Sequence, residues 1–293
     1  MNNSSFFIKN KAMFGSYPSQ QSVEELELEG VRYFINLTHT NETKIIPYIT
    51  KYNTINFPIT DRSVPDNIPT FCKFIIDICE IIKNLKSNND LHQKVYVHCR
   101  AGHGRSGIIV ACILCNIFNL KPYDALLYTT KCHSNRSIMK DKWRKIGSPQ
   151  THQQKKFVYK LFEPININKI YKHNVFSHKI SIENIDFLHI FHVYNFYKQT
   201  FEKDPFNKIF NKFDTNNKLW NDIKEIIMEF IVETSMETNK ELKENLLNSY
   251  LRPIIAYLYG DNIWGIGKDS TGENKLGIIL NKLRLKYINR RAI

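Results

Sequence analysis

The sequence has no apolar run long enough to cross a membrane. Its best candidate, residues 108–115, is far shorter than the ~20 apolar residues that a spanning helix needs. Residues 1–5 are polar and no apolar run follows them, so we expect no secretory signal peptide. These two absences predict a cytoplasmic or nuclear protein without membrane insertion, in a compartment where thiols stay reduced.

The cysteines lack the spacing of a metal site. Cys112 and Cys115 form a Cys-x-x-Cys pair, but the segment around them has the composition of a buried helix, and no second pair stands at a metal-binding spacing. Cys72 and Cys79 are expected on one face of another helix. We therefore expect all four side chains to pack in a core, and we expect neither a metal nor a cofactor.

Acidic residues are scarce relative to basic ones. The 293 residues include 41 Lys and Arg against 28 Asp and Glu, which gives a formal net charge of +13. This charge favours anionic partners such as phosphorylated proteins, nucleic acid or an acidic membrane surface. An Asn-, Lys- and Ile-rich coding bias explains the excess equally well. The length and the hydrophobic fraction of 42% suffice for about two domains with sizeable cores.

One stretch, residues 94–120, combines a strand, a glycine-rich loop and a helix. Lys94–Val97 has the residues of a strand, and Ile108–Leu120 is apolar enough for a buried helix. Between them Cys99 and Arg105 have the spacing Cys-x5-Arg. Three glycines are interleaved: Gly102, Gly104 and Gly107.

The chemistry of phosphate binding explains this spacing. A loop around a phosphate turns its backbone N–H groups inward, and glycines allow that curvature. A helix that opens at Ser106 adds free N–H donors and the positive end of its dipole. Arg105 can hold two phosphate oxygens at once. A thiol in such a site ionises easily, so the stretch predicts a nucleophilic cysteine.

The stretch closely resembles the signature of the cysteine-dependent protein tyrosine phosphatases, His-Cys-x5-Arg-Ser/Thr. The resemblance implies that Cys99 forms a phosphocysteine, that Arg105 binds the transferring phosphoryl group, and that Ser106 donates to the Cys99 thiolate. His98 would orient the loop. The substrate phosphate would contact Arg100, Ala101, Gly102, His103 and Gly104. A glycine-rich turn with a buried cysteine is the alternative interpretation.

A second loop, residues 57–66, offers a proton donor for the leaving group. It is interrupted by prolines and follows a predicted strand, so its side chains are expected to be exposed. In the compact, dual-specificity branch of the phosphatase family the general acid stands on such a loop, and Asp61 is in the matching place. Asp66 is the competitor, although it also suits the cap of a helix that starts near Ile68 and Pro69.

A third stretch, residues 147–157, resembles the glutamine loop of larger tyrosine phosphatases, Gln-Thr-x-x-Gln-x-x-Phe. By this resemblance Gln150 would orient the water that hydrolyses the phosphocysteine, and Gln154 would assist at the substrate. The alternative is a helix N-terminus with solvated glutamines.

The elements before the signature follow the β-α-β order of an α/β domain. Strands are predicted at 31–37 and 52–59, and a helix is predicted to start at Ser22 with a capping box formed with Glu25. The resemblance implies a tyrosine phosphatase-like twisted sheet flanked by helices, and we assign it residues 1–164.

A second, mostly helical domain is expected over residues 171–293. Residues 259–267 and 272–277 resemble the C-terminal signature of the NADAR (YbiA-like) family, and the resemblance extends back to about Asn174. That family hydrolyses N-glycosidic bonds in riboflavin-pathway intermediates or ADP-ribosylated nucleotides, which implies an ADP-ribose-like nucleotide ligand. Residues 284–293 are predicted to form a basic tail.

This second domain departs from its family at one position. The segment Glu-His-x-Tyr/Phe-Gln of the family stands here as Phe191-His192-Val193-Tyr194-Asn195. His192 and Tyr194 match, but Phe191 replaces the glutamate on which the glycosidase chemistry depends. We therefore predict a degenerate domain without hydrolase activity, in which Asp261 and Trp264 still shape a nucleotide-like pocket.

The predicted function is hydrolysis of phosphotyrosine, and also of phosphoserine and phosphothreonine, on protein substrates. The chain lacks the Lys-Asn-Arg-Tyr segment that deepens the pocket in classical tyrosine phosphatases, so the depth of the pocket stays open. Two alternatives remain. One is an RNA 5′-triphosphatase, which the positive charge would suit. The other is an adaptor whose second domain binds ADP-ribose-like ligands.

Overall fold

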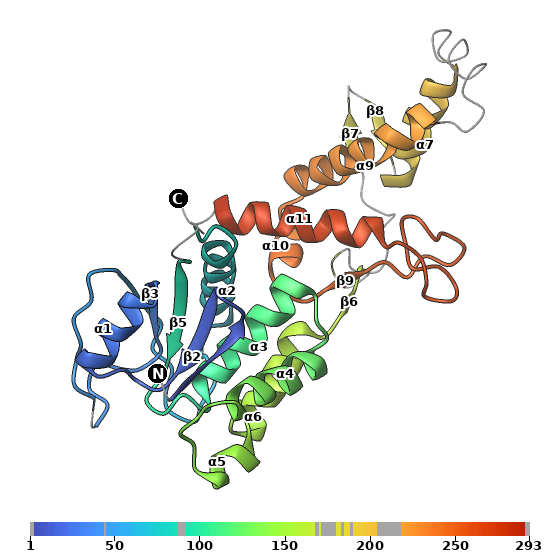
Figure 1. Ribbon diagram of the computed structural model, residues 1–293. Coiled ribbons are helices and arrows are strands. Elements are labelled where there is room, and N and C mark those ends of the chain that lie inside the picture. Colours follow the sequence, from blue (N-terminus) through green and yellow to red (C-terminus); the bar gives the residue numbers. More distant parts are fainter. Residues whose placement is uncertain are drawn as a thin grey trace. The chain divides into compact units, whose positions relative to one another are not determined.

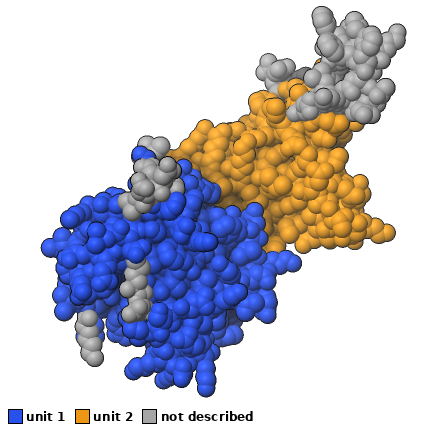
Figure 2. Space-filling view, in the orientation of Figure 1, with its two compact units in different colours: residues 1–163 blue, residues 164–293 orange. Residues whose placement is uncertain are grey.

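The computed structural model describes residues 3–43, 45–86, 92–167, 170, 180–182, 185–187, 190–203 and 218–290. It divides the chain into two compact units, residues 1–163 and 164–293, which Figure 2 colours blue and orange. Asn174, to which the second resemblance extends, lies outside the described residues. No helix in the described ranges is long and apolar enough to cross a lipid bilayer.

A five-stranded sheet forms the centre of residues 1–163. In spatial order its strands are β1 (Ser4–Ile8), β2 (Ala12–Gly15), β5 (Lys94–His98), β3 (Val31–Asn36) and β4 (Asn53–Asn56). β1 pairs with β2 in antiparallel fashion, and the other three pairings are parallel. Every residue of β5 is buried, as expected for a central parallel strand that helices cover on both faces.

Helices cover both faces of this sheet (Figure 1). On one face, Val23 and Leu26 of α1 (Gln20–Leu28) pack against apolar residues of three strands: Met13, Val31, Phe34 and Tyr96. The other face carries α3 (Arg105–Phe118), which contacts β2 and β5 and has α2 (Ile68–Lys83) beside it. α4 (Pro122–Ser134) and α6 (His152–Phe162) pack against α3, and α5 (Asp141–Ile146) joins them. The predicted α/β fold is confirmed.

The cysteines of α2 and α3 are buried in the core, as predicted. They are Cys72, Cys79, Cys112 and Cys115. Burial raises the pKa of Cys79 and of Cys115 to about 12, so both stay protonated at neutral pH. No group of three or more His, Cys, Asp or Glu side chains within the described ranges is arranged to hold a metal ion.

The carboxyl ends of the four parallel strands lie at one edge of the sheet. Gly15 at the end of β2 pairs with His98 at the end of β5, and His98 also pairs with Asn36 at the end of β3. Asn36 in turn pairs with Asn56 at the end of β4. The four loops that follow these residues therefore meet, which is where parallel sheets place their ligand sites.

Residues 164–293 form a mostly helical unit, as predicted. Its helices are α7 (Ile190–Lys203), α9 (Lys218–Thr238), α10 (Lys240–Leu247) and α11 (Lys275–Arg290). Its short strands are β6 (Ile165–Asn166) with β9 (Ile254–Ile255), and β7 (Ile180–Ile182) with β8 (Ile185–Phe187). One apolar core joins the helices named here to β6 and β9, and it includes Met228 and Ile231 of α9 and Leu280 and Leu283 of α11.

Three local expectations were wrong. α1 begins at Gln20 rather than Ser22, because the extended Ser19 accepts the Ser22 N–H through its side chain at 3.2 Å. Asn67, not Asp66, caps α2: its side chain accepts the Thr70 N–H at 3.0 Å. The expected basic tail is largely helical, since α11 continues to Arg290 and buries Arg284 and Tyr287.

Candidate active site

The loop after β5, residues 99–104, surrounds the sulfur of Cys99, and we call it the signature loop. The Gly102 N–H donates to Cys99 Sγ at 3.3 Å, and Ser106 Oγ lies 3.6 Å from the same atom. Cys99 is buried, with 3% of its surface exposed. α3 begins at Arg105, so its free N–H groups and the positive end of its dipole lie beside the sulfur. This environment places hydrogen-bond donors where an incoming phosphate would bind.

The sharp turn of the loop depends on Gly102. Its φ is +74°, and a Cβ there would lie 2.4 Å from the carbonyl carbon of Gly15. A glycine is needed for both reasons. Arg136, buried at the end of α4, secures this turn by donating to the Gly102 carbonyl at 2.9 Å and to the Phe14 carbonyl at 3.2 Å. Burial lowers the pKa of Arg136 to about 10, so it is charged at neutral pH.

The Arg105 side chain is buried and held on several sides. Its Nη1 donates to the carbonyls of Leu37 at 3.3 Å and Ile59 at 3.0 Å. Both Nη atoms donate to the Glu42 carboxylate, with Nη2 at 3.0 Å from Oε2. Burial opposes ionisation of Glu42, but the hydrogen bonds and charge of Arg105 outweigh it and lower the Glu42 pKa. Nε of Arg105 has no partner in the described part of the chain.

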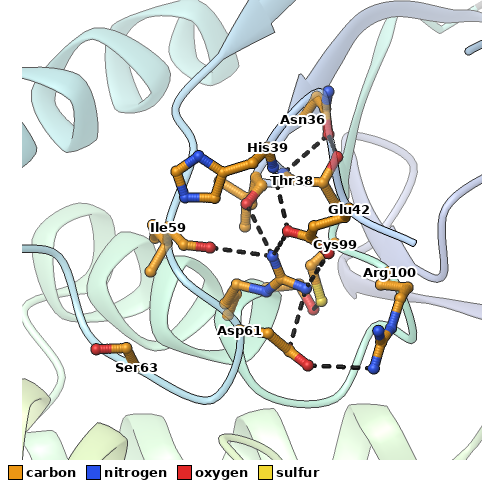
Figure 3. Close-up of polar contacts among 12 residues, drawn as sticks. Asn36, Thr38, His39, Glu42, Ile59, Asp61, Ser63, Cys99 and Arg100 are labelled. Atoms are coloured by element: carbon orange, nitrogen blue, oxygen red, sulfur yellow. Dashed lines mark hydrogen bonds and ion pairs between the residues drawn. The ribbon is translucent and has the colours of Figure 1, made fainter. Parts of the chain in front are cut away.

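Asp61 lies at the mouth of the loop. Its Oδ1 is 3.0 Å from Arg105 Nη2, and its Oδ2 accepts from Arg100 Nη2 at 3.2 Å (Figure 3). The side chain is 42% exposed, so it is accessible from solvent. Asp66 is exposed too, and no hydrogen bond or ion pair joins it to the described residues of this loop. The structure thus brings Asp61, and not Asp66, to the signature.

The His98 side chain is buried and forms a hydrogen bond with a tyrosine. Its Nε2 is 2.8 Å from the hydroxyl of Tyr48, and the rings of Tyr17 and Tyr96 pack against it at 5.0 and 5.6 Å between centroids. Burial lowers the pKa of His98 to about 3, so the imidazole is neutral at physiological pH.

The His103 side chain packs against residues of α4 and α5. Its Nδ1 is 2.8 Å from Nε2 of the buried His133 of α4, and its ring stacks on Trp143 of α5 with centroids 5.0 Å apart. Burial lowers the pKa of His103 to about 4 and that of His133 to about 3. These contacts fix the position of the His103 ring. Ala101, two residues earlier in the loop, is exposed.

The two glutamines of the third stretch differ in their surroundings. Gln154 is buried: its Oε1 accepts the Thr151 N–H at 3.1 Å, and its Nε2 donates to the Ser63 carbonyl at 3.0 Å. A Cβ on Gly104 would lie 2.9 Å from this amide, so Gln154 packs directly on the signature loop. Gln150 is half-buried just before α6.

Four residues around the loop escaped sequence reasoning. They are Glu42, Tyr48, His133 and Arg136. Each contacts a signature residue from a distant part of the chain. Glu42 and Tyr48 stand in a polar loop without any motif, so the sequence carries no signal of their partners. Arg136 offers a weak signal, as an arginine soon after an amphipathic helix.

In residues 164–293, the segment that carries Phe191 forms part of α7. Phe191 packs against the apolar core, and His192 is exposed. The indole N–H groups of Trp220 and Trp264 donate to the buried Tyr194 hydroxyl, and burial is the main cause of its raised pKa. Asp261 Oδ1 accepts the backbone N–H of Trp264 at 2.8 Å, which orders the turn around that ring.

Comparisons with known proteins fall into the same two parts. Residues 13–154 match the family model of the dual specificity phosphatase catalytic domain, and residues 166–287 match that of the NADAR domain. The chain is 37% identical over 164 residues to 067L, a candidate tyrosine phosphatase of Invertebrate iridescent virus 3, covering 55% of this chain and 66% of the relative. It is 40% identical over 170 residues to 197R, a candidate tyrosine phosphatase of Invertebrate iridescent virus 6, covering 57% of each.

A solved structure resembles the first unit as well. The crystal structure of Tk-PTP in its active form superimposes with a TM-score of 0.42 at 20% identity, covering 54% of this chain and 94% of that one. The matched segments span just under two thirds of the first viral relative and 57% of the second. The chain therefore carries a member of the dual specificity phosphatase catalytic-domain family at residues 13–154 and a member of the NADAR family at residues 166–287.

Proposed function

We propose that residues 1–163 hydrolyse phosphate monoesters on proteins, phosphotyrosine first and phosphoserine and phosphothreonine also, through a phosphocysteine intermediate. One observation carries the proposal: a carboxylate, Asp61, stands 3.0 Å from the buried guanidinium of Arg105, in the loop that surrounds the Cys99 sulfur. The names of the two viral relatives support the choice of a tyrosine phosphatase.

In the first step the Cys99 thiolate attacks phosphorus, and the bond from phosphorus to the ester oxygen breaks. Asp61 gives its proton to that leaving oxygen. The Nε–H of Arg105 and the inward-facing amides of the loop stabilise the charge on the transferring phosphoryl group. An arriving phosphate would replace Asp61 on Arg105, which releases the carboxyl group toward the leaving oxygen.

In the second step water attacks the phosphocysteine. Asp61, now a carboxylate, takes the proton of that water while the sulfur–phosphorus bond breaks. Ser106, whose hydroxyl lies 3.6 Å from the sulfur, donates to the departing thiolate. We assign the positioning of the water to Gln150. Both ends of the Gln154 amide are already hydrogen-bonded, so we assign Gln154 to the support of the loop.

The test is release of inorganic phosphate by the purified full chain from three substrates: a phosphotyrosine peptide, a phosphothreonine peptide and 5′-triphosphorylated RNA. Cys99→Ser is the control, and it should abolish turnover while phosphate still binds. Preference for the peptides supports a protein phosphatase, and their ratio reports the depth of the pocket. Preference for RNA would replace the proposal with the RNA phosphatase, whereas full activity of Cys99→Ser would refute the mechanism.

For residues 164–293 we propose binding of an ADP-ribose-like nucleotide without hydrolysis. The observation in favour of binding without hydrolysis is Phe191, since an apolar residue packed on the core stands where the family has its glutamate and supplies no acid or base. Calorimetric titration of the full chain with ADP-ribose tests binding, and chromatography of the mixture tests hydrolysis. Excess inorganic phosphate, which would occupy the signature loop, should not weaken the binding of ADP-ribose, because the second unit and not that loop would hold the nucleotide. Release of adenine, the product of cleaving the N-glycosidic bond of ADP-ribose, or no binding, would contradict the proposal.

A further inference from the structure

The segment between β3 and β4 contacts the signature loop at both of its ends. We propose that this support loop, residues 38–50 with residue 44 outside the described part, positions the catalytic groups, Glu42 orienting Arg105 and Tyr48 orienting His98. The inference rests on the phosphatase function proposed above, and it adds two positioning residues to that site.

The support loop has anchors of its own on α1. The Gln20 side chain donates to the Ile49 carbonyl at 3.0 Å and accepts the Ile49 N–H at 2.9 Å. Glu27 Oε1 accepts from Thr50 Oγ1 at 2.6 Å and from the Lys51 N–H at 2.9 Å. The carboxyl-terminal end of the support loop, next to Tyr48, is therefore held by α1 through contacts that do not involve the signature loop.

Glu42 determines the plane of the Arg105 guanidinium. Its two carboxylate oxygens receive hydrogen bonds from Nη1 and Nη2, and the His39 N–H donates to Oε1 at 3.1 Å. Such a two-point contact fixes orientation as well as distance. Arg105 is 1% exposed, so water screens its interaction with an oxyanion only weakly.

Tyr48 determines the state of the His98 ring. Its hydroxyl, which burial keeps protonated by raising its pKa, is 2.8 Å from Nε2. If the hydroxyl donates to Nε2, the single proton of the neutral imidazole stays on Nδ1. That atom has no partner among the described residues and belongs to the residue next to the nucleophile. The rings of Tyr48 and Phe34, 5.7 Å apart, keep the hydroxyl in place.

The two contacts predict separable effects, which alkylation can measure without turnover. The rate at which iodoacetamide alkylates Cys99 is measured at a series of pH values, and the midpoint of that pH dependence is the first quantity. Mass spectrometry identifies the modified residue. Protection by inorganic phosphate at a pH above every midpoint then gives the affinity for the anion. Cys79, Cys112 and Cys115 do not interfere, since burial raises the pKa of each.

Tyr48→Phe keeps the ring and removes the hydroxyl. We expect the alkylation midpoint of Cys99 to rise by about one pH unit, because the neighbouring imidazole loses its fixed tautomer. Phosphate protection should stay within twofold of the wild type. Tyr123→Phe, an exposed tyrosine on α4, is the matched control and should change neither quantity.

Glu42→Asp keeps the charge and shortens the side chain by one methylene. We expect phosphate protection to weaken about tenfold and kcat to fall by about 100-fold, because the guanidinium loses its two-point contact. The alkylation midpoint should not move. Glu42→Gln keeps the reach of the side chain and should bind phosphate better than Glu42→Asp. Glu24→Asp on the exposed face of α1 is the control.

The inference is overturned if each variant shifts both quantities together, or if neither variant shifts any, while circular dichroism shows a folded chain. A general loss of folding would move the melting temperature along with both readouts, which separates it from positioning. Because alkylation and protection do not require turnover, a wild-type chain without phosphatase activity would refute the proposed function and leave this test intact.

Discussion

Asp61 Oδ1 lies 3.0 Å from Nη2 of Arg105. The carboxylate therefore occupies part of the surface that a phosphate oxygen would use, and it neutralises a buried guanidinium. We therefore expect a bound phosphoester to displace Asp61 from Arg105, toward the oxygen that has to be protonated.

Asp61→Asn should remove the proton donor and keep the shape of the side chain. We expect kcat for a phosphothreonine peptide to fall by about 100- to 1,000-fold, because an alkoxide leaves poorly without a proton. An aryl phosphate with an acidic leaving group should lose far less. Steady-state phosphate release on both substrates measures this difference. Asp66→Asn is the control on the same loop, and an equal loss on both substrates would rule out Asp61 as the acid.

Gly102→Ala should disrupt the signature loop. The new Cβ would lie 2.4 Å from the Gly15 carbonyl carbon, and backbone cannot yield as a flexible side chain can. We expect phosphate release to drop at least ~100-fold, since the amide that donates to Cys99 would move.

Gly260→Ala is the matched control for Gly102→Ala. Gly260 also has a positive φ, +86°, but a Cβ there would meet no atom within 4 Å. The Gly260→Ala substitution should lower the free energy of unfolding by about 1 kcal/mol through backbone strain alone, and it should leave phosphate release unchanged. Melting temperature and activity, measured side by side, separate strain from steric conflict.

Arg136→Lys should loosen the turn at Gly102. A lysine keeps the charge, but it cannot reach the Gly102 and Phe14 carbonyls with a rigid fork as Arg136 does. We expect kcat to decrease by about tenfold or more with little change in melting temperature. Arg32→Lys replaces an arginine that donates to two carbonyls away from the signature loop, and its activity should equal that of the wild type.

The buried histidines predict a loss of stability in mild acid. Burial lowers the pKa of His98 to about 3, of His103 to about 4 and of His133 to about 3, whereas an unfolded histidine titrates near 6.5. Below pH ~6.5 the unfolded chain therefore binds more protons than the folded one. Each histidine then costs on the order of 1 kcal/mol of stability per pH unit, down to its folded pKa.

Melting temperatures at pH 7, 6 and 5 measure this effect. His133→Gln should melt lower than the wild type at pH 7, because His103 loses a partner, but its melting temperature should depend less on pH. His152→Gln, at an exposed position, should follow the wild type at every pH. A slope in His133→Gln equal to that of the wild type would show that other groups cause the acid loss.

The central elements of the first unit could be predicted from the residue types of short segments. The strand before Cys99, the helix after Arg105 and the glycines between them each follow from residue types over a few positions. The predictions erred at the starts of α1 and α2, where a second residue able to cap a helix lies close in the sequence. Ser19 precedes Ser22 by three residues, and Asn67 follows Asp66 directly. The choice of Ser19 and Asn67 was made by backbone conformation, which composition does not reveal.

The sequence by itself determined the signature loop, its family and the position of the nucleophile, because phosphate binding by a curved loop at a helix N-terminus is a local property of the chain. Only the tertiary structure decided which residues hold that loop. Parallel pairing of β2, β5, β3 and β4 brings the ends of four strands to one edge, so that Glu42 and Asp61 meet Arg105, and Tyr48 meets His98, across gaps of 44 or more residues. A lone glutamate or tyrosine in a polar loop carries no trace of such partners, since its role is created by long-range packing.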